Sequence, residues 1–275
     1  MVVQHMMDTS WAMDGDKPAS VGSLHSVGCA LKILRMFSVE HTTLGITEVA
    51  KQLAIAKSTA HRLMSTLVRE GFVYQNPKTR QYHLGMAVLG LSGIITADSD
   101  IWIAAAPYLT ELTMKTGEAS HLAVLDGFHV VYLHKVESTH PVKILTHLGR
   151  RNPLHATSSG KLLLAHAEPG FVEDVIDHGL APFTATTITG PAQLRQELAD
   201  IRQRGYAVSR EELREQIVSI SAPVFNHHHH VVAAVNIVAP SARLTCAHLD
   251  ARARAVANTA SQIARDLGYR PRVGS

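Results

Sequence analysis

Hydroxyl side chains gather just before an expected helix in the second half of the chain, in the run Thr157-Ser158-Ser159-Gly160. A helix expected over residues 162–167 would direct its N-terminal amides and the positive end of its dipole at this run. Donors that converge in this way suit the carboxylate of a small acid. The residues also fit a purely structural interpretation, in which Thr157 or Ser158 only caps the helix.

A second group of residues, nearer the N-terminus, has the side-chain types that contact DNA. The segment 57–69 has a helical apolar face formed by Ala60, Leu63, Met64 and Leu67. Its opposite face carries charges and hydroxyls, namely Lys57, Ser58, His61, Arg62, Ser65 and Arg69. A helix of this kind fits the major groove of B-DNA. The alternative is a protein-interaction module with a solvated polar face.

Other candidate chemistries have weaker patterns. The run 227–230 consists of four histidines, but neighbours in a turn rarely all point at one metal ion. No Gly-x-Ser-x-Gly elbow or nucleotide-binding loop accompanies the hydroxyls of residues 157–160. We therefore expect no catalytic residue, no metal and no cofactor. A metal- or redox-sensing protein that uses His227–His230, Cys29 or Cys246 is kept as the alternative function.

Three helices and a hairpin are expected to position the basic helix face. Apolar residues recur at helical spacing over 24–37, Thr47 is the expected N-cap of a second helix, and Gly71 ends the third. Short strands over 72–74 and 81–84 then flank a polar, basic turn. This order predicts a winged helix-turn-helix.

Positive charge is concentrated in the same segment. The whole chain has a net charge of +3, yet residues 23–85 carry eight lysines and arginines against three acidic residues. Residues 86–275 are balanced, as expected for a polyanion-binding module beside a neutral domain. We expect double-stranded operator DNA to be contacted by Thr47, Lys57, Ser58, Thr59, His61, Arg62, Lys78 and Arg80.

The rest of the chain predicts an α+β domain preceded by a linker. Residues 86–103 are apolar, and we expect a linker helix that packs against a partner subunit or against its own chain. The elements expected beyond it are a helix over 104–116, strands over 119–125, 130–137 and 142–146, a helix from Pro191 to Gly205, a hairpin of 216–225 with 231–239, and a final helix over 247–267.

Length and composition fit this organisation. The 275 residues are 46% hydrophobic, which is ordinary for globular domains and excludes disorder of the whole chain. No apolar run is long enough for a membrane span, no secretory signal is present, and two distant cysteines fit the cytoplasm. We therefore expect a cytoplasmic protein with a disordered tail (1–22), a DNA-binding domain (23–85), a linker helix (86–103) and an effector-binding domain (104–275).

The chain resembles the IclR family of bacterial transcriptional regulators from about Leu24 to Leu267. The resemblance is carried, in this order, by Gly45-Ile46-Thr47-Glu48-Val49-Ala50, Lys57-Ser58-Thr59-Ala60-His61-Arg62-Leu63, Gly71-Phe72-Val73, the stretch from Arg150 to Lys161, Arg204-Gly205-Tyr206-Ala207 with Glu211-Glu212, and Ser221-Ala222-Pro223-Val224. It implies a winged helix-turn-helix, a linker helix and a GAF-like effector domain. It also implies a homodimer or homotetramer whose binding to operator DNA responds to a small organic or aromatic acid.

The resemblance also implies which residues contact the effector. By position, the family's contacts fall on Ile144, Ser158, Ser159, Ser209, Ser219, Asn236 and Val238. Many family members have an acidic residue where Ser209 stands and a cysteine or another small residue where Ser219 stands, so the effector itself does not transfer. Ser219 and Asn236 are polar residues in otherwise apolar strands, and each needs a partner if it is buried.

Overall fold

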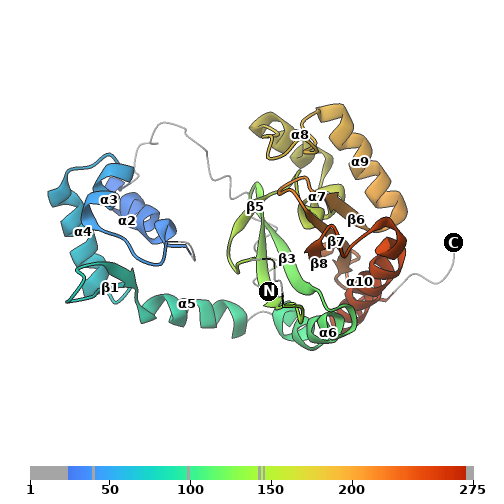
Figure 1. Ribbon diagram of the computed structural model, residues 1–275, viewed down its shortest axis with the longest axis horizontal. Helices are drawn as coiled ribbons and strands as arrows, with labels where there is room; N and C mark the ends of the chain where they lie inside the picture. The colour runs from blue at the N-terminus through green and yellow to red at the C-terminus, as the bar shows by residue number, and fades with distance from the viewer. Residues whose placement is uncertain (1–23, 39–40, 98–99, 142–143, 145, 271–275) are drawn as a thin grey trace. The chain divides into compact units, whose positions relative to one another are not determined.

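The computed structural model describes residues 24–38, 41–97, 100–141, 144 and 146–270, and the tail expected over 1–22 lies outside them (Figure 1). The described chain forms two compact units, one within residues 24–97 and one within 100–270. No helix in these ranges is long and apolar enough to cross a membrane.

The N-terminal unit has the elements of a winged helix-turn-helix. Its elements in order are α2 (His25–Met36), α3 (Ile46–Gln52), α4 (Lys57–Arg69), β1 (Val73–Gln75), β2 (Tyr82–Leu84) and α5 (Met86–Ala97). The two strands pair antiparallel, and Leu44 forms an isolated bridge with Tyr82. Ile33, Val49, Met64 and Val73 are buried together at the centre of this unit.

The ends of α4 follow from local sequence. After Arg69, Gly71 takes a left-handed conformation with φ of +75°, and Phe72 N donates back to Leu67 O at 2.9 Å. This is the Schellman arrangement, which favours glycine because other residues rarely adopt positive φ. The predicted helix and its C-terminal glycine are therefore confirmed.

The expected N-cap of α3 is wrong. Gly45 occupies that position, and Thr47 lies inside the helix with its side chain exposed. The Glu48 carboxylate accepts a hydrogen bond from Gly45 N at 3.5 Å, which returns a side chain to the start of the helix. Glycine is an acceptable N-cap, so the acidic residue three positions later was the better signal.

The expected linker helix over 86–103 is also wrong in its extent. The linker helix α5 ends at Ala97, and residues 100–103 form the first turn of α6 (Asp100–Thr116). Ile101 is buried in the core of the C-terminal unit, so this end of the apolar run packs on its own chain. The sequence carries a signal at this boundary, because Asp98-Ser99-Asp100 interrupts the apolar run with residues that favour the start of a helix.

The C-terminal unit is built on one antiparallel sheet. Its order is β5 (Arg151–Pro153), β4 (His129–Val136), β3 (Ala119–Asp126), β8 (Val231–Pro240), β7 (Ile217–Phe225) and β6 (Ala207–Arg210). Its further helices are α7 (Ser158–Ala165), α8 (Pro169–His178), α9 (Pro191–Arg204) and α10 (Cys246–Asp266). The α+β class and both predicted hairpins are confirmed.

The two faces of the sheet bury different cores. On one face, Leu122 of β3, Ile220 of β7 and Ile237 of β8 are fully buried against α6 and α10. On the other, Ala123 and Ala234 lie with the buried side chains of α7 and α9. Successive side chains of a strand point to opposite faces, which places alternate residues in the two cores.

Several elements were not foreseen or differ. β5, β6 and α8 were not predicted, and α7 begins at Ser158 rather than at Leu162. Ile144 and Thr146 are not in a strand, while the rest of the strand expected over 142–146 lies outside the described residues. β5 and β6 are edge strands of only a few residues, too short to show an alternating pattern.

Candidate functional site

The polar face of α4 is fully available to a partner of the N-terminal unit. Lys57, Ser58, Thr59, His61 and Arg62 are all exposed. The N-cap Ala56 makes no side-chain capping bond, so the first amides of α4 have no acceptor inside the helix. Together the exposed amides, hydroxyls and cations form a surface suited to phosphate and base edges.

The turn between β1 and β2 presents two further cations. The Asn76 side chain accepts hydrogen bonds from Lys78 N at 2.9 Å and Thr79 N at 3.2 Å. Arg80, with φ of +60°, closes the turn through its own N–H bond to Asn76 O at 2.8 Å. Lys78 and Arg80 are therefore held on an ordered, exposed turn, as the sequence predicted for the tip of a wing.

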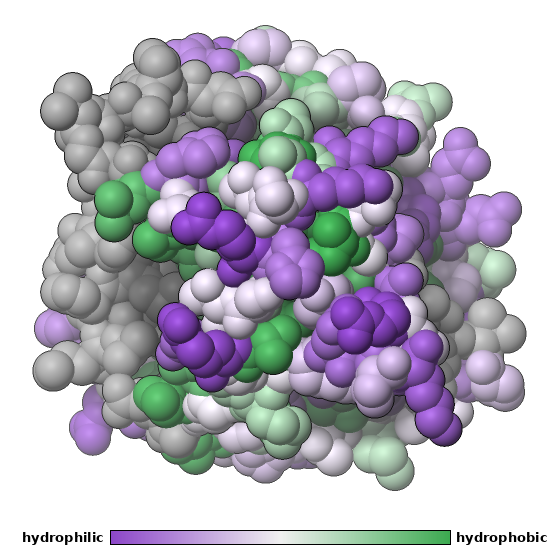
Figure 2. Space-filling view, turned by 90° about the vertical axis from the view of Figure 1, so that its left-hand side faces the viewer, coloured by the Kyte–Doolittle hydropathy of each residue, from purple (hydrophilic) through white to green (hydrophobic). Residues whose placement is uncertain are grey.

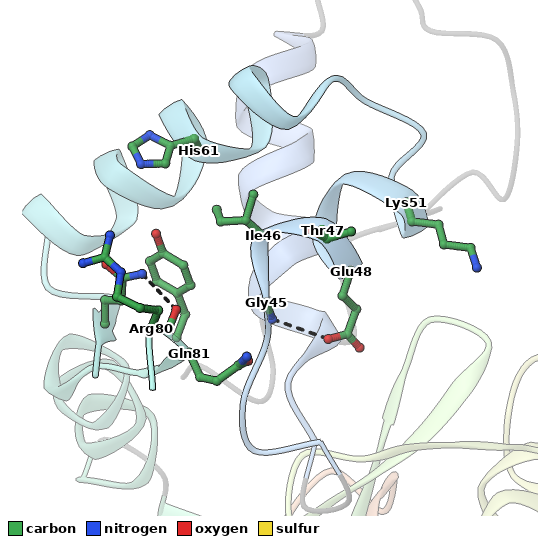
Figure 3. A pocket seen from close by; sticks show the side chains of 10 residues that line it. Gly45, Ile46, Thr47, Glu48, Lys51, His61, Arg80 and Gln81 are labelled. Atoms are coloured by element: carbon green, nitrogen blue, oxygen red, sulfur yellow. Dashed lines mark hydrogen bonds between the residues drawn. The ribbon is translucent and has the colours of Figure 1, made fainter. Parts of the chain in front are cut away.

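A surface hollow of about 710 Å³ joins α3, α4 and the wing. Its lining includes Thr47, Lys51, His61 and Arg80, four of the polar side chains on this side of the unit. Figure 3 shows His61 above Arg80 on the same side of the picture, while Lys51 points away from them on the other side. In Figure 2 the corresponding face is mainly hydrophilic, with single apolar side chains between. This surface can accept a polyanion.

In the C-terminal unit, sheet register brings polar side chains into a row beneath α7. His121 on β3 pairs with Asn236 on β8, and Asn236 pairs with Ser221 on β7. One pair further along, Ser219 lies between Ser209 of β6 and Val238 of β8. Residues directly opposite in neighbouring strands point to the same face, so these side chains meet.

The first turn of α7 lies above this row of polar side chains. Thr157 is its N-cap, since Thr157 Oγ1 accepts from Gly160 N at 3.1 Å. Ser158 and Ser159 are the first two helical residues, so their amides have no acceptor within the helix and their hydroxyls are free to bond elsewhere. Capping, one of the two interpretations made from the sequence, is thus confirmed for Thr157, while the hydroxyls of Ser158 and Ser159 face the sheet.

The hydroxyls and the amide form one directional hydrogen-bonded chain. Asn236 Nδ2 donates to Ser159 Oγ at 2.8 Å, and Ser159 Oγ lies 3.0 Å from Ser221 Oγ. Ser221 Oγ is 2.7 Å from Ser158 Oγ, which donates to Ser219 Oγ at 2.7 Å. Each hydroxyl has one proton, so every proton along the chain is used until Ser219 is reached. Among the described residues the Ser219 proton has no acceptor.

His121 and Tyr132 complete the site and were missed from the sequence. His121 Nδ1 lies 2.8 Å from Asn236 Oδ1, and His121 Nε2 lies 2.6 Å from Thr146 Oγ1. The Tyr132 ring stacks on the imidazole with centroids 4.4 Å apart. Burial lowers the pKa of His121 to about 4 and raises the pKa of Tyr132. The sequence signal that could have identified His121 is a histidine within an expected strand that is otherwise mostly apolar.

Ser209, Val238 and Ile144, the remaining predicted effector residues, are not members of this hydrogen-bonded chain. Ser209 is buried and donates to Ala156 O at 3.1 Å. Val238 is buried beside Ser219 in the sheet, and Ile144, between β4 and β5, is half-buried. The structure thus brings Ser158, Ser159, Ser219 and Asn236 together as predicted and adds Ser221 and His121.

A buried ion network holds α7 in place. Lys161 is fully buried, and its Nζ donates to Glu212 at 2.7 Å and to Glu197 at 3.2 Å. Arg204 also binds Glu197, at 2.9 Å. Burial raises the pKa of Glu212, and the nearby Lys161 ammonium opposes this rise. The network satisfies the ammonium of Lys161, so this cation is not directed at the serine hydroxyls.

The histidines of the alternative function lie in an exposed turn. His227–His230 are exposed in the β7–β8 turn, where Asn226 Oδ1 accepts from His228 N and His230 N. Throughout the described ranges there is no group of three or more histidine, cysteine, aspartate or glutamate side chains that could hold a metal. Cys29 is a free, buried cysteine in α2 with its Sγ 3.5 Å from His25 Nε2.

Comparisons with known proteins agree with both units. The description "IclR helix-turn-helix domain" matches residues 26–77, and "Bacterial transcriptional regulator IclR C-terminal" matches residues 95–265. The Escherichia coli HTH-type transcriptional regulator XynR is 33% identical over 90% of this chain and 98% of its own.

Solved structures share this fold. The IclR transcriptional regulator from Alicyclobacillus acidocaldarius has a TM-score of 0.80 and 26% identity, over 90% of this chain and 100% of its own. An IclR homologue from Microbacterium hydrocarbonoxydans, crystallised with 4-hydroxybenzoate, has a TM-score of 0.78 and 26% identity, over 88% of this chain and 99% of its own.

Proposed function

Because the chain belongs to the IclR family of DNA-binding transcriptional regulators, we propose that a small organic or aromatic acid bound beneath α7 modulates its binding to operator DNA. The acid's carboxylate meets the N-terminus of α7 and the Ser219 hydroxyl. Val238 and Ile144 border its apolar body, and Ser209 supports the adjoining loop through Ala156 O.

The observation that carries this proposal is the direction of the hydrogen-bonded chain. The run of hydroxyl protons leaves one donor at Ser219, which is only half-buried. The amides of Ser158 and Ser159 are further donors at the positive end of the α7 dipole. Donors without acceptors favour a ligand group that only accepts, and a carboxylate is such a group. The homologue crystallised with 4-hydroxybenzoate supports the same class of ligand.

On the DNA side, we propose that α4 enters the major groove and that the wing contacts the backbone. Arg62 and His61, with Ser58 and Thr59, reach base edges from the exposed face of α4, whereas Lys57 and Thr47 contact phosphates. Lys78 and Arg80 hold the backbone or the minor groove from the wing. These assignments rest on exposure, charge and the hollow that connects the three elements.

The ligand proposal is tested by thermal shift with matched compounds. 4-Hydroxybenzoate, benzoate and lactate are each compared with their uncharged amides, because only the charged form benefits from the α7 dipole. A ligand at 100 times its dissociation constant adds about 2.7 kcal/mol to the free energy of unfolding. We expect the acids, but not the amides, to raise the melting temperature.

The same assay on Ser219→Val locates the site. Valine fills the strand position but removes the terminal donor, so the acid-dependent shift should disappear. Binding of the ligand-free variant to duplexes selected by the wild-type protein from a random library should stay unchanged. Thr139→Val, an exposed hydroxyl outside the site, serves as the control. Equal acid-induced shifts in wild type and Ser219→Val would remove the ligand from this position.

A further inference from the structure

The site beneath α7 contains no charged side chain that could balance a bound carboxylate. None of the hydrogen bonds of its six polar residues, Ser158, Ser159, Ser219, Ser221, Asn236 and His121, involves a lysine, an arginine or an acid among the described residues. Lys161, in the first turn of α7, is already paired with Glu212 and Glu197. A buried anion without a counter-charge is costly, so a compensating charge would strengthen its binding.

His121, which belongs to the hydrogen-bonded group beneath α7, can supply that positive charge. Asn236 uses its Nδ2 to donate to Ser159, so its Oδ1 accepts from His121 Nδ1–H. Neutral histidine carries a single ring proton, which leaves Nε2 as an acceptor for the Thr146 hydroxyl. These contacts fit a neutral ring, and because burial lowers the pKa of His121, the ring is neutral near pH 7 in the ligand-free protein.

The partners of His121 can also accommodate its protonated form, and only the hydroxyl proton of Thr146 has to rotate. Asn236 Oδ1 accepts from Nδ1–H in either state. The Thr146 hydroxyl donates to Nε2 when the ring is neutral, and after rotation of its own proton it accepts from Nε2–H when the ring is charged. Both ring protons of an imidazolium would thus be hydrogen-bonded, which removes one obstacle to charging a buried histidine.

Charges that face His121 come from one neighbouring strand. Lys135 and His134 on β4 disfavour the imidazolium, and Glu137, just after β4, favours it. Lys135 is itself bound to Glu137 at 2.6 Å and to Thr146 O at 2.6 Å, so its charge is largely compensated. On β8, Asn236 is hydrogen-bonded to His121, and on α7, Ser159 is linked to His121 through Asn236. Neither of these side chains titrates. A carboxylate would add the one negative charge that this environment lacks.

We propose that His121 is the charge-balancing residue of the acid site and takes up one proton from solvent when the carboxylate binds. This inference rests on the proposed function. The bound state then contains an imidazolium and a carboxylate, joined through Asn236 and the serine hydroxyls. Affinity for the acid should rise tenfold for each unit by which the pH falls, over the range where the acid is ionised, free His121 is neutral and bound His121 is protonated.

Calorimetry counts the proton directly. Titration of 4-hydroxybenzoate, benzoate and lactate into the full-length wild-type protein, at one pH in two buffers of different ionisation enthalpy, should give an uptake close to one proton per site. His121→Gln retains a hydrogen-bonding side chain that cannot be charged, and it should bind the acid with no uptake and no pH dependence. His134→Gln, which removes a histidine from the neighbouring strand, should keep the wild-type uptake.

The outcomes test the role of His121 and the proposed acid site separately. Acid binding by the wild type without proton uptake would overturn the role of His121 and leave the proposed ligand site intact. Uptake that persists in His121→Gln would assign the proton to another group and equally refute the inference. If none of the three carboxylates binds, the proposed acid site itself fails, and the inference with it. The wild-type measurement needs no variant, so a misfolded His121→Gln protein does not prevent the decision.

Discussion

Two cations on the N-terminal unit should contribute differently to DNA binding. Arg62 lies on the exposed face of α4, and Lys78 lies on the wing turn. We expect Arg62→Ala to cost about 1–3 kcal/mol on selected duplexes and little on unselected ones, because a bidentate base contact is lost. Lys78→Ala should weaken both alike and reduce the salt slope by about one.

Titrations at several salt concentrations separate these two effects. Lys115→Ala, an exposed lysine on α6 of the other unit, is the matched control and should leave affinity and salt slope unchanged. Selected-duplex binding by Arg62→Ala at wild-type strength in every salt concentration would show that α4 does not read bases through this residue.

His121 also makes stability depend on pH in the absence of ligand. Its pKa falls from 6.5 to about 4 because burial disfavours the charged ring. Below pH 6.5 the unfolded chain therefore binds a proton that the folded chain does not, and stability declines as the pH falls. Between about pH 7 and about pH 5 this residue should remove about 2 kcal/mol from the free energy of unfolding.

Urea unfolding at both pH values checks this contribution. His121→Gln should lose about 2 kcal/mol less than wild type over the interval. His227→Gln, which alters an exposed histidine of the β7–β8 turn, should behave as wild type. Identical pH dependence in wild type and His121→Gln would mean that folding leaves the pKa of His121 unchanged.

Sequence reasoning found the hydroxyls of this site but not its imidazole. Ser158 and Ser159 stand out because they precede a helix, and Asn236 because it interrupts an apolar strand. His121 lies on β3, which is distant in sequence, and only the register of β3 with β8 brings it to Asn236. Strand register depends on long-range pairing, which a single sequence does not reveal.

At the scale of elements, the start of α7 depends on a glycine. A side chain at Gly160 would place its Cβ 2.5 Å from Leu154 Cα, whereas a Cβ at Gly170 in α8 meets nothing within 4 Å. We expect Gly160→Ala to destabilise the C-terminal unit by about 1–3 kcal/mol through overpacking. Gly170→Ala should instead be neutral or stabilising by up to about 1 kcal/mol, because alanine is the better helix former.

This pair of variants also tests whether α7 controls the ligand site. Gly160→Ala moves the helix start that carries Ser158 and Ser159, so the thermal shift caused by 4-hydroxybenzoate should shrink. Gly170→Ala should retain it. Chemical denaturation gives the stability of each variant separately. If Gly160→Ala is as stable as wild type, the backbone around Leu154 yields more easily than the close packing of this unit indicates.

Elements with strong local signals were predictable, and elements fixed by packing were not. Gly71 and Gly205 end α4 and α9 in the left-handed conformation, and Pro191 opens α9. By contrast, the boundary between α5 and α6 was missed, although Asp98-Ser99-Asp100 interrupts the apolar run there. The apolar pattern alone also does not show that Ile101 is buried in the C-terminal core, to which the end of the run belongs.

At the scale of the whole molecule, the segregation of charge in the sequence agrees with two separate units. The basic segment forms the unit with the exposed cationic helix, and the neutral remainder forms the sheet whose one face carries the proposed acid site. The distribution of charge along a chain is a property of composition, so it can be read before any fold is known. The composition does not show how copies of the chain assemble.

We expect the assembly of protein copies to depend on α5. Met86, Leu89 and Ile94 are 76%, 62% and 66% exposed, an apolar face that a single copy of the N-terminal unit leaves in water. Such faces mark interaction sites, and a two-fold dimer would match a palindromic operator. We therefore expect the wild-type protein to be a dimer or larger at micromolar concentration in light scattering.

Leu89→Glu should shift the protein toward monomers and weaken DNA binding, because a charge cannot be buried unpaired at the interface. Met114→Glu, at a 72% exposed position of α6, should leave the mass unchanged. A monomeric wild type would show that α5 is not an interface.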